Sequence, residues 1–339
     1  MKNWPIVLLL KELEFSSIYD SYKAKARWAV ETNRSVKHLI QEKLFFSVIV
    51  PTYRRPHYLA KLLEALAQQT FPKDRFQVIV VDDGGGTLLD TIVAPFKRVL
   101  NLTLVYQENT GPAAARNYGA SFAKGTFLAF TDDDCRPAPG WLEALAEVLE
   151  QSPVSLCGGR THNALINDPF AQATQNLADY VYQEYKPAHN VGAFFLTNNL
   201  ALPRKDFLKI GGFDPSLRFG EDRELCRRWT WRCNALVYVP NAIVYHSHPL
   251  KLASFLRLHF SYGTGTVQFN KRCTQKGLKP ARLSPPSYYV KLIFSGLGEK
   301  KNAHGLLISV LLLLSQLCYT TGYAWDAVRK RITERLKSK

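Results

Sequence analysis

Three consecutive aspartates, Asp132 to Asp134, follow the apolar run TFLAF and could do chemistry together. Adjacent carboxylates repel one another by roughly 1 kcal/mol per pair in water, and by more where solvent is partly excluded. A hard divalent cation would relieve this repulsion, because it binds oxygen ligands and often bridges them to phosphate. A solvated acidic loop could have the same sequence, so the segment alone leaves both interpretations open.

The elements that must position these acids alternate along the chain between two hydrophobic periods. Short, buried-type runs predict strands, and segments with apolar residues on one helical face lie between them. The strands are predicted at FFSVIVP (45–51), FQVIVVDD (76–83), LTLVYQE (102–108) and TFLAF (126–130), and the helices at 57–70 and 111–125. This alternation predicts βαβ units and a parallel sheet, and so an α/β fold.

Polar residues gather where the predicted strands end. Pro51 and Tyr53 follow the first strand, Asp82 and Asp83 close the second, and the three aspartates follow the fourth. In an open α/β sheet, ligands bind outside the carboxyl ends of the strands. Arg116 lies about one turn into the helix at 111–125, where a guanidinium and helix-start amides both favour phosphate, although an ordinary surface arginine would have the same sequence context.

The ordered set of motifs resembles family 2 glycosyltransferases, which are inverting enzymes of GT-A fold. The motifs are VIVPTYRR, VVDDGGG, NTGPAAARNYGA, FTDDDCRPAPGW, NNLALPRKDFLKIGGFD and FGEDRELCRR. The resemblance implies a Rossmann-like, mostly parallel sheet flanked by helices over residues 46–250. We expect a helical N-terminal extension at 1–45 and a basic, helical, membrane-associated region at 251–339.

On the donor side, the resemblance implies a nucleotide-sugar site with Mg²⁺ or Mn²⁺. Asp132 and Asp134 match the family's DxD pair, with Asp133 between them; Asp134 would bind the metal, Asp132 the ribose or the metal, and His246 would complete the metal shell. Asp83 would accept from the N3–H of uracil or thymine, which favours UDP or dTDP as the carrier, although a carboxylate could also bind guanine. The other residues assigned to the donor site are Pro51, Tyr53 and Arg116.

On the acceptor side, the resemblance assigns Asp222 as the base that takes the proton of the attacking hydroxyl. Glu221 beside it would raise the pKa of Asp222, although an acidic helix start could also serve only the helix dipole. Asn199, Asp214 and Trp229 are the residues expected to contact the acceptor, and a tryptophan such as Trp229 is also common in a helix core.

The formal net charge of +16 is concentrated at the ends of the chain. Residues 251–339 contain 16 Lys and Arg against three acids, and residues 1–45 contain eight against five, so the centre is formally neutral. A basic end suits an anionic membrane surface or nucleic acid. Because the bases surround an apolar segment and no nucleic-acid reading motif is present, we expect no nucleic-acid partner.

The apolar segment GLLISVLLLLSQLCY (305–319) is long enough to span a bilayer, but bases flank both of its sides. An interfacial or re-entrant helix on anionic lipid fits this pattern better, and the alternative is a buried helix or a dimer interface. The six scattered cysteines indicate reduced thiols in the cytosol. We therefore expect a peripheral protein on the cytoplasmic face of a membrane.

The sequence thus predicts an inverting, metal-dependent glycosyltransferase. It would move a sugar from a nucleotide-diphosphate donor to a hydroxyl of a saccharide or lipid-linked acceptor, as in polysaccharide or glycolipid synthesis. The alternatives are a polyprenyl-phosphate sugar synthase and, more distantly, an inactive scaffold or a nucleic-acid binder. The oligomeric state stays open, with a dimer as one option.

Overall fold

The computed structural model describes residues 44–86, 89–184, 194–232, 235–281, 284–298 and 302–337, and the side chains of all of these except residues 184 and 330–337. The helical extension predicted for residues 1–45 lies outside the described residues, apart from its last two positions. The predictions for residues 46–339 fall largely within them.

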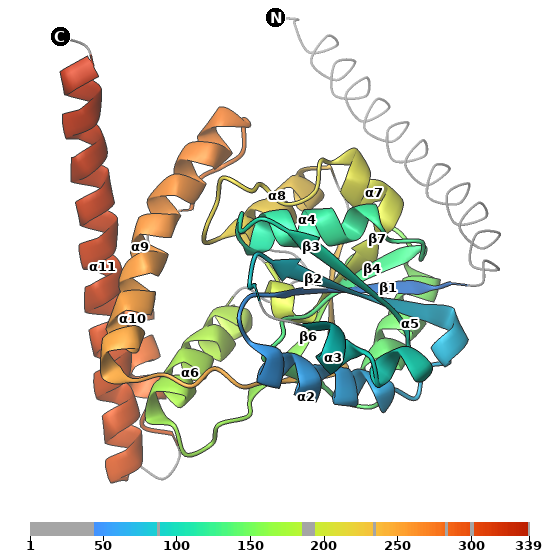
Figure 1. Cartoon of the computed structure of the whole chain (residues 1–339). Coiled ribbons are helices and arrows are strands. Elements are labelled where there is room, and N and C mark those ends of the chain that lie inside the picture. The colour runs from blue at the N-terminus through green and yellow to red at the C-terminus, as the bar shows by residue number, and fades with distance from the viewer. Residues whose placement is uncertain are drawn as a thin grey trace, which may run out of the picture.

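One eight-stranded mixed sheet forms the centre of the molecule, with strand order β3-β2-β1-β4-β7-β6-β8-β5 (Figure 1). Its strands are β1 (Phe46–Thr52), β2 (Phe76–Asp83), β3 (Asn101–Gln107), β4 (Phe127–Phe130), β5 (Cys135–Pro137), β6 (Leu156–Asn163), β7 (Leu200–Pro203) and β8 (Leu236–His246). The four strands β3, β2, β1 and β4 pair in parallel, as the sequence predicts. Beyond them, β7 is antiparallel to both of its neighbours and β5 is antiparallel to β8, so this half of the sheet is mixed.

Helices cover both faces of the sheet, which explains why every residue of β1 and β2 is buried. Val48 and Val50 point to one face, where they join the core formed with α2 and α5, and Ile49 points to the other, where it joins α4, α7 and α8. These helices are α2 (Pro56–Ala67), α3 (Leu89–Val93), α4 (Pro112–Ser121), α5 (Trp141–Gln151), α7 (Arg204–Lys209) and α8 (Glu221–Trp231). Three 3₁₀ turns complete this part: η1 (Lys73–Arg75), η2 (Phe96–Arg98) and η3 (Thr197–Asn199).

The parallel register brings the predicted polar strand ends to one edge of the sheet. Thr52 pairs with Asp82 across β1 and β2, and Ile49 pairs with Phe130 across β1 and β4, so the aspartates after β4 lie beside the end of β1. Helix α4 packs closely on these strands, because a Cβ at Gly119 would lie only 2.7 Å from Ile49 Cγ2. This close approach places the start of α4 above the same edge.

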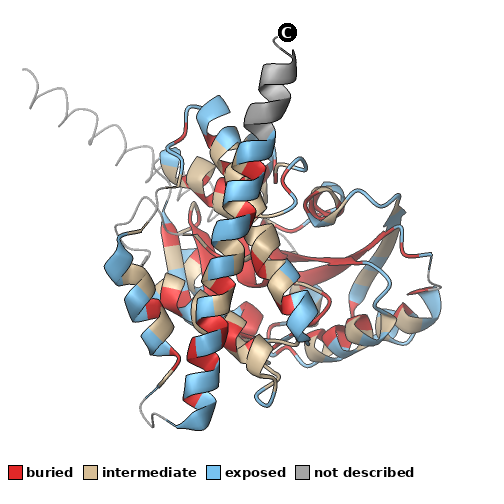
Figure 2. Ribbon diagram, turned by 90° about the vertical axis from the view of Figure 1, so that its left-hand side faces the viewer, coloured by how far each residue is buried: buried red, intermediate tan, exposed pale blue. Residues whose placement is uncertain are grey.

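A layer of long helices lies beside the sheet domain (Figure 1): α6 (Pro169–Glu184), α9 (Leu252–Gln275), α10 (Pro286–Ser295) and α11 (Ala303–Lys337). Helices α9 and α11 pack through glycines, since a Cβ at Gly263 would overlap the carbonyl of Tyr319 and one at Gly322 would overlap that of Phe260. The segment Ala303–Arg329 has a mean hydropathy of 1.6 and is long enough to cross a membrane, although a core helix can have the same length and composition. Figure 2 shows buried and exposed residues alternating along α11.

Candidate active site

The three aspartates after β4 lie against the end of β1. The hydroxyl of Thr52 donates to Asp133 at 2.8 Å, and Nη1 of Arg55 donates to Asp133 at 3.1 Å and to Asp134 at 2.7 Å. Both acids are buried, and burial raises the pKa of Asp133 to about 7 in spite of the Arg55 charge. The motif VIVPTYRR contains Thr52 and Arg55, but it assigns neither residue a contact with the aspartates, because those contacts depend on how the strand ends approach one another.

Two histidines at the end of β8 face Asp134. His246 Nε2 lies 3.2 Å from one oxygen of this carboxylate and His248 Nδ1 lies 3.7 Å from the other. Burial opposes ionisation of Asp134, but the hydrogen bonds of the two histidines hold its pKa below the usual range. One ligand atom from each of the three residues lies within 4.8 Å of the others, an arrangement that could hold a divalent cation. The structure therefore joins Asp134 to the predicted His246 and adds His248.

Arg116 connects the aspartates to the acids of α8. Its side chain is buried, with Nη2 2.6 Å from Asp132 Oδ1 and Nη1 3.1 Å from Glu221 Oε1. Its Nε has no hydrogen-bond partner among the described residues. Asp132 is thus held by Arg116. It lies outside the cluster of Asp134 and the two histidines, although it is also one of the metal ligands expected from the sequence.

Asp222 lies in the first turn of α8, next to Glu221. Burial, followed by the neighbouring charge of Glu221, raises the pKa of Asp222 to about 7. Burial also raises the pKa of Glu221, although Arg116 opposes this shift. One Asp222 oxygen accepts from the backbone N–H of Arg223 at 2.7 Å, which fixes the carboxylate at the helix start. A carboxylate with a pKa near neutrality can take a proton at physiological pH.

Asp83, at the end of β2, is buried and ties this strand to the loop that precedes α4. Its Oδ1 accepts from Gln107 Nε2 at 2.7 Å and from the backbone N–H of Thr110 at 2.9 Å, while Oδ2 accepts from the backbone N–H of Gly111 at 2.9 Å. An ionised carboxylate oxygen can accept two hydrogen bonds, and Oδ2 accepts one from the described residues, so it keeps one position for a ligand donor. Asp82 instead supports its own loop by accepting from the N–H of Gly85 at 2.7 Å.

The two other predicted donor residues differ in their access to solvent. Pro51 is buried inside β1, so its side chain is part of the core, whereas Tyr53 is 41% exposed beside the strand end. The guanidinium of Arg54 lies 5.1 Å from the centre of the Tyr53 ring. Of this pair, only Tyr53 is exposed at the edge where the carboxylates gather, with Arg54 over one face of its ring.

The structure corrects two of the residues expected to contact the acceptor. Trp229 is fully buried in the core beneath α8, so neither face of its ring is open to a sugar. Asn199 is also buried: it accepts from Trp141 Nε1 at 2.9 Å and donates to the carbonyls of Ala242 and Arg160. With both N–H bonds of its amide donated and its oxygen bonded to Trp141, Asn199 holds η3 against the sheet.

The third predicted acceptor residue, Asp214, is committed to α9. Lys276 lies 2.8 Å and Arg272 3.5 Å from its carboxylate, and Ser216 donates to it from both backbone and side chain. Burial opposes the shift, but these partners, Lys276 first, lower its pKa to about 2. Asp214 thus fastens the loop that leads into α8.

Comparison with known proteins gives the family. The model of glycosyl transferase family 2 matches residues 47–213. Glycosyltransferase AglE of Haloferax volcanii is 30% identical over 227 residues, which is 66% of this chain and 73% of the relative. The chondroitin synthase of Escherichia coli is 29% identical over 282 residues, 73% of this chain and 40% of the relative. The chain belongs to glycosyl transferase family 2 and is a glycosyltransferase.

Solved structures give the same fold. The mannosyltransferase PcManGT from Pyrobaculum calidifontis, solved with GDP-Man and Mn²⁺, aligns with a TM-score of 0.55 at 18% identity and covers 95% of this chain and 92% of its own. Residues 1–349 of TarS from S. aureus align with a TM-score of 0.50 at 18% identity, covering 85% of this chain and 92% of their own. The predicted GT-A fold is confirmed.

Proposed function

We propose that the chain catalyses inverting transfer of a sugar from a nucleotide-diphosphate donor, with UDP or dTDP favoured, to a hydroxyl of a saccharide or lipid-linked acceptor. The observation that carries this proposal is the bridge made by buried Arg116 between Asp132 and Glu221. The bridge joins Asp132, which lies two residues before the metal-cluster acid Asp134, to Glu221, the neighbour of the proposed base Asp222. An inverting transfer needs both groups on one site.

Asp134, His246 and His248 would hold the metal. A carboxylate with two imidazoles is a mixed oxygen and nitrogen set, which favours Mn²⁺ over Mg²⁺, since Mg²⁺ prefers oxygen ligands alone. When bound, the cation neutralises charge that develops on the leaving diphosphate. Nε of buried Arg116 has no partner in the described part of the chain and would be a further donor for a phosphate oxygen.

Asp83 would select the base of the donor. Uracil and thymine carry a proton on N3, which the remaining position on Asp83 Oδ2 can accept, whereas cytosine has an acceptor at N3. The backbone bonds from Thr110 and Gly111 keep the carboxylate at the strand end. Tyr53, exposed at the neighbouring strand end, offers an aromatic face beside it.

Asp222 would act as the base. The acceptor oxygen forms its bond to the anomeric carbon as the bond from that carbon to the diphosphate breaks, and the electron pair of the broken bond leaves with the nucleotide. The hydroxyl proton passes to Asp222, whose raised pKa suits this transfer. Attack from the side opposite the leaving group inverts the anomeric configuration. Glu221, held by Arg116, supports the pKa of Asp222 by its charge.

We also infer that the protein is peripheral on the anionic, cytoplasmic face of a membrane. Helix α11 is buried on the protein side, whereas Leu306, Val310, Leu313 and Leu317 are 43–59% exposed on its outer side. The spacing of these residues places them on one helical face. Arg329 and the basic sequence after it would interact with anionic headgroups.

A thermal-unfolding panel tests the donor proposal. UDP, dTDP, GDP and CDP are each added with Mn²⁺ or with EDTA, to the wild type, to Asp134→Asn and to Asp74→Asn as an exposed control. At 100 times its dissociation constant, a ligand stabilises the fold by about 2.7 kcal/mol. We expect Mn²⁺-dependent stabilisation by UDP or dTDP in the wild type and the control, and its loss in Asp134→Asn. Equal stabilisation by CDP, or none by any nucleotide, would contradict the proposed site.

A further inference from the structure

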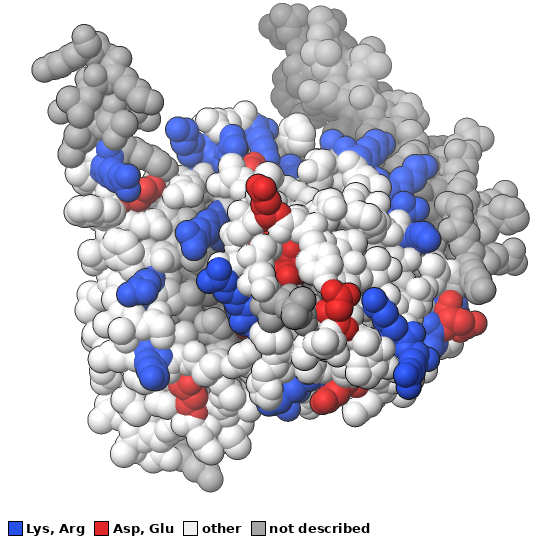
Figure 3. Space-filling model, viewed as in Figure 1, with Lys and Arg blue, Asp and Glu red and all other residues white. Residues whose placement is uncertain are grey.

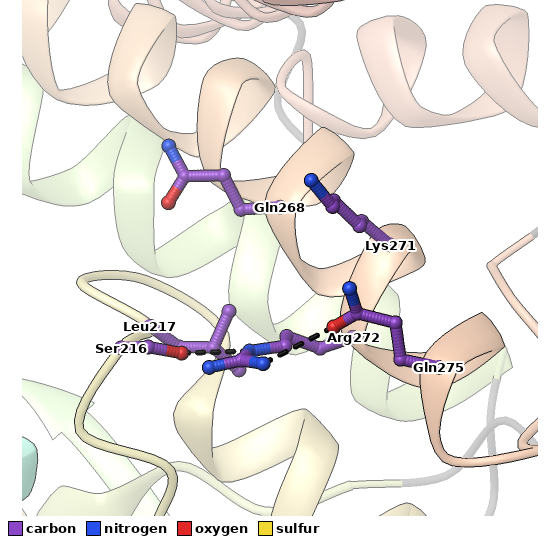
Figure 4. A pocket seen from close by; sticks show the side chains of 6 residues that line it. All are labelled: Ser216, Leu217, Gln268, Lys271, Arg272 and Gln275. Carbon is purple, nitrogen blue, oxygen red and sulfur yellow. Dashed lines mark hydrogen bonds between the residues drawn. The ribbon is translucent and has the colours of Figure 1, made fainter.

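A pocket of about 310 Å³ lies between α9 and the loop that leads into α8, apart from the donor residues (Figure 4). Its lining consists of Ser216, Leu217, Gln268, Lys271, Arg272 and Gln275. Two of these six side chains are cations, two are amides and none is acidic. Cations together with amides favour a ligand that carries both negative charge and hydroxyl groups.

The two cationic side chains of the pocket differ in how many contacts they already make within the protein. Arg272 is held in place: its Nε donates to Ser216 Oγ at 2.8 Å, its Nη1 donates to Gln275 Oε1 at 3.1 Å, and Asp214 lies 3.5 Å from its Nε. Lys271 is exposed and forms no ion pair within the described part of the chain. The pocket therefore offers one positioned guanidinium and one ammonium free to meet a ligand.

The surroundings of the pocket are also basic. The guanidinium groups of Arg223 and Arg227, on α8, lie 5.2 and 5.3 Å from the centre of the Phe269 ring on α9. Glu224, which follows Arg223 on α8, is already paired with Arg228 at 2.7 Å and with Lys276 at 2.7 Å. Figure 3 shows Lys and Arg gathered along the upper margin of the molecule, toward this end of α9. The local excess of positive charge therefore attracts anions.

The pocket lies next to the proposed base along the chain. Leu217 is buried in the lining, and five residues later the same segment reaches Asp222, a span of at most about 17 Å. Gly220, with φ of 82°, ends the loop against Phe269 and opens α8. An oligosaccharide with its terminal hydroxyl at Asp222 is long enough to reach the pocket with a preceding sugar residue.

We propose that this pocket is an acceptor subsite for an anionic group, a carboxylate or a phosphate, carried by a saccharide chain behind the hydroxyl that is glycosylated. Lys271 and Arg272 bind the anionic group, and Gln268 and Gln275 hydrogen-bond the neighbouring hydroxyls. The proposal rests on the glycosyl transfer described above and specifies its acceptor as a polyanionic saccharide. Binding at this subsite requires neither the metal nor the nucleotide.

Calorimetric binding of defined hexamers tests the subsite. The probes are a hexamer of galacturonic acid, a phosphorylated maltohexaose and neutral maltohexaose, with the wild type, Lys271→Glu and the control Lys61→Glu. Lys61 is an exposed lysine on α2, so its replacement changes the net charge equally. We expect one charged hexamer to bind the wild type and Lys61→Glu at least about tenfold more tightly than maltohexaose, and Lys271→Glu to lose that preference.

Which charged hexamer binds distinguishes a carboxylate from a phosphate ligand. Equal binding of maltohexaose, or equal affinities of Lys271→Glu and Lys61→Glu for the charged hexamers, would overturn the proposal. Equal binding of a hexathymidylate, a polyanion without a saccharide chain of this kind, would also overturn it and assign the patch to general anion attraction.

The nucleotide panel on the same samples separates the two proposals. Hexamer binding that depends on Lys271, in a protein that no nucleotide stabilises, would overturn the donor site and support the subsite. Nucleotide stabilisation without any preference for a charged hexamer would support the donor site and overturn the subsite.

Discussion

Arg55 Nη1 lies 2.7 Å from Asp134 Oδ2, so a side chain from beyond the end of β1 neutralises the acid that the cation would bind. The same nitrogen lies 3.1 Å from Asp133. Arg55 is half exposed while both acids are buried, which leaves the arginine able to move and the acids fixed. Arg55 and a divalent cation therefore supply the same kind of counter-charge to one carboxylate.

Replacement of Arg55 should make the protein more dependent on metal. In EDTA, Arg55→Gln should lower the free energy of unfolding by about 1 kcal/mol, because two buried carboxylates lose a cation. Added Mn²⁺ should then raise the unfolding temperature more in the variant than in the wild type. Arg136→Gln, which removes an exposed arginine on β5, is the control. The same Mn²⁺ shift in all three proteins would show that Arg55 and the cation do not share this site.

Arg116→Lys should weaken both the fold and the site. A lysine has one ammonium and cannot donate to Asp132 and Glu221 from opposite sides as the guanidinium does. Loss of one charge-assisted hydrogen bond to a largely buried carboxylate should lower the free energy of unfolding by roughly 1.5–3 kcal/mol, measured in urea. Arg98→Lys, an exposed arginine in η2, should leave it unchanged. If Arg116→Lys and Arg98→Lys had the same free energy of unfolding, the contacts of Arg116 with Asp132 and Glu221 would not stabilise the fold.

The rate of transfer should follow the ionisation of Asp222. A base must be deprotonated, and burial with the charge of Glu221 raises the pKa of Asp222 to about 7. Hence kcat/KM should fall about tenfold for each pH unit below 7 and become constant above it. Asp133 also has its pKa raised to about 7, so Asp133→Asn is the control: its residual activity should keep the acidic limb of the profile. If kcat/KM of Asp133→Asn did not change with pH, the acidic limb of the wild-type profile would be due to Asp133 and not to Asp222.

Asp222→Asn distinguishes the two classes of acceptor. With a hydroxyl acceptor, loss of the base should lower kcat by about 10²–10⁴-fold while nucleotide binding is retained. A lipid phosphate acceptor is already anionic and needs no base, so a polyprenyl-phosphate sugar synthase would keep its activity in this variant. The measurement is single-turnover transfer to both kinds of acceptor. Asp206→Asn on α7 is the control for the lost charge.

The sequence predicts the strands and acids of this site well, because buried parallel strands have a clear apolar pattern and their carboxyl ends must share an edge. This pattern places Asp83, Asp132 and Asp134 near that edge, whereas Asp222 and His246 are assigned by the resemblance to the family. It fails where a role depends on pairing across the sheet or on burial. His248 meets Asp134 only because β8 pairs with β5 beside the aspartates, in a register that sequence periodicity does not contain.

The errors at Asn199 and Trp229 have one physical cause. Both residues have chemistry that suits a sugar, a side-chain amide and a large aromatic ring, and both are used inside the fold instead. Asn199 satisfies the Trp141 indole N–H and two carbonyls, and Trp229 fills the core below α8. Side-chain type alone cannot separate the two uses. The deciding quantity is exposure, which depends on tertiary packing.

The outer face of α11 gives a prediction about the membrane. Leu313 and Leu317 are 43% and 56% exposed and lie one turn apart on the side away from the protein. Leu313→Glu with Leu317→Glu should abolish flotation with vesicles that contain phosphatidylglycerol, because two charges would enter the acyl boundary. The paired control is Val99→Glu with Ile166→Glu, two exposed apolar residues outside α11 that are 53% and 72% exposed.

The salt dependence of flotation and the oligomeric state distinguish a lipid-bound outer face of α11 from a subunit interface. If lipid covers α11, wild-type flotation should weaken at high salt, through the basic residues, but full release should need detergent. The double α11 variant should then stay as compact and as monomeric as the wild type. The face is a subunit interface if the wild type does not bind vesicles and sediments as a dimer, while the double α11 variant sediments as a monomer. In that case the lipid assignment fails, and the apolar stripe along Leu306 to Leu317 belongs to a second copy of the chain.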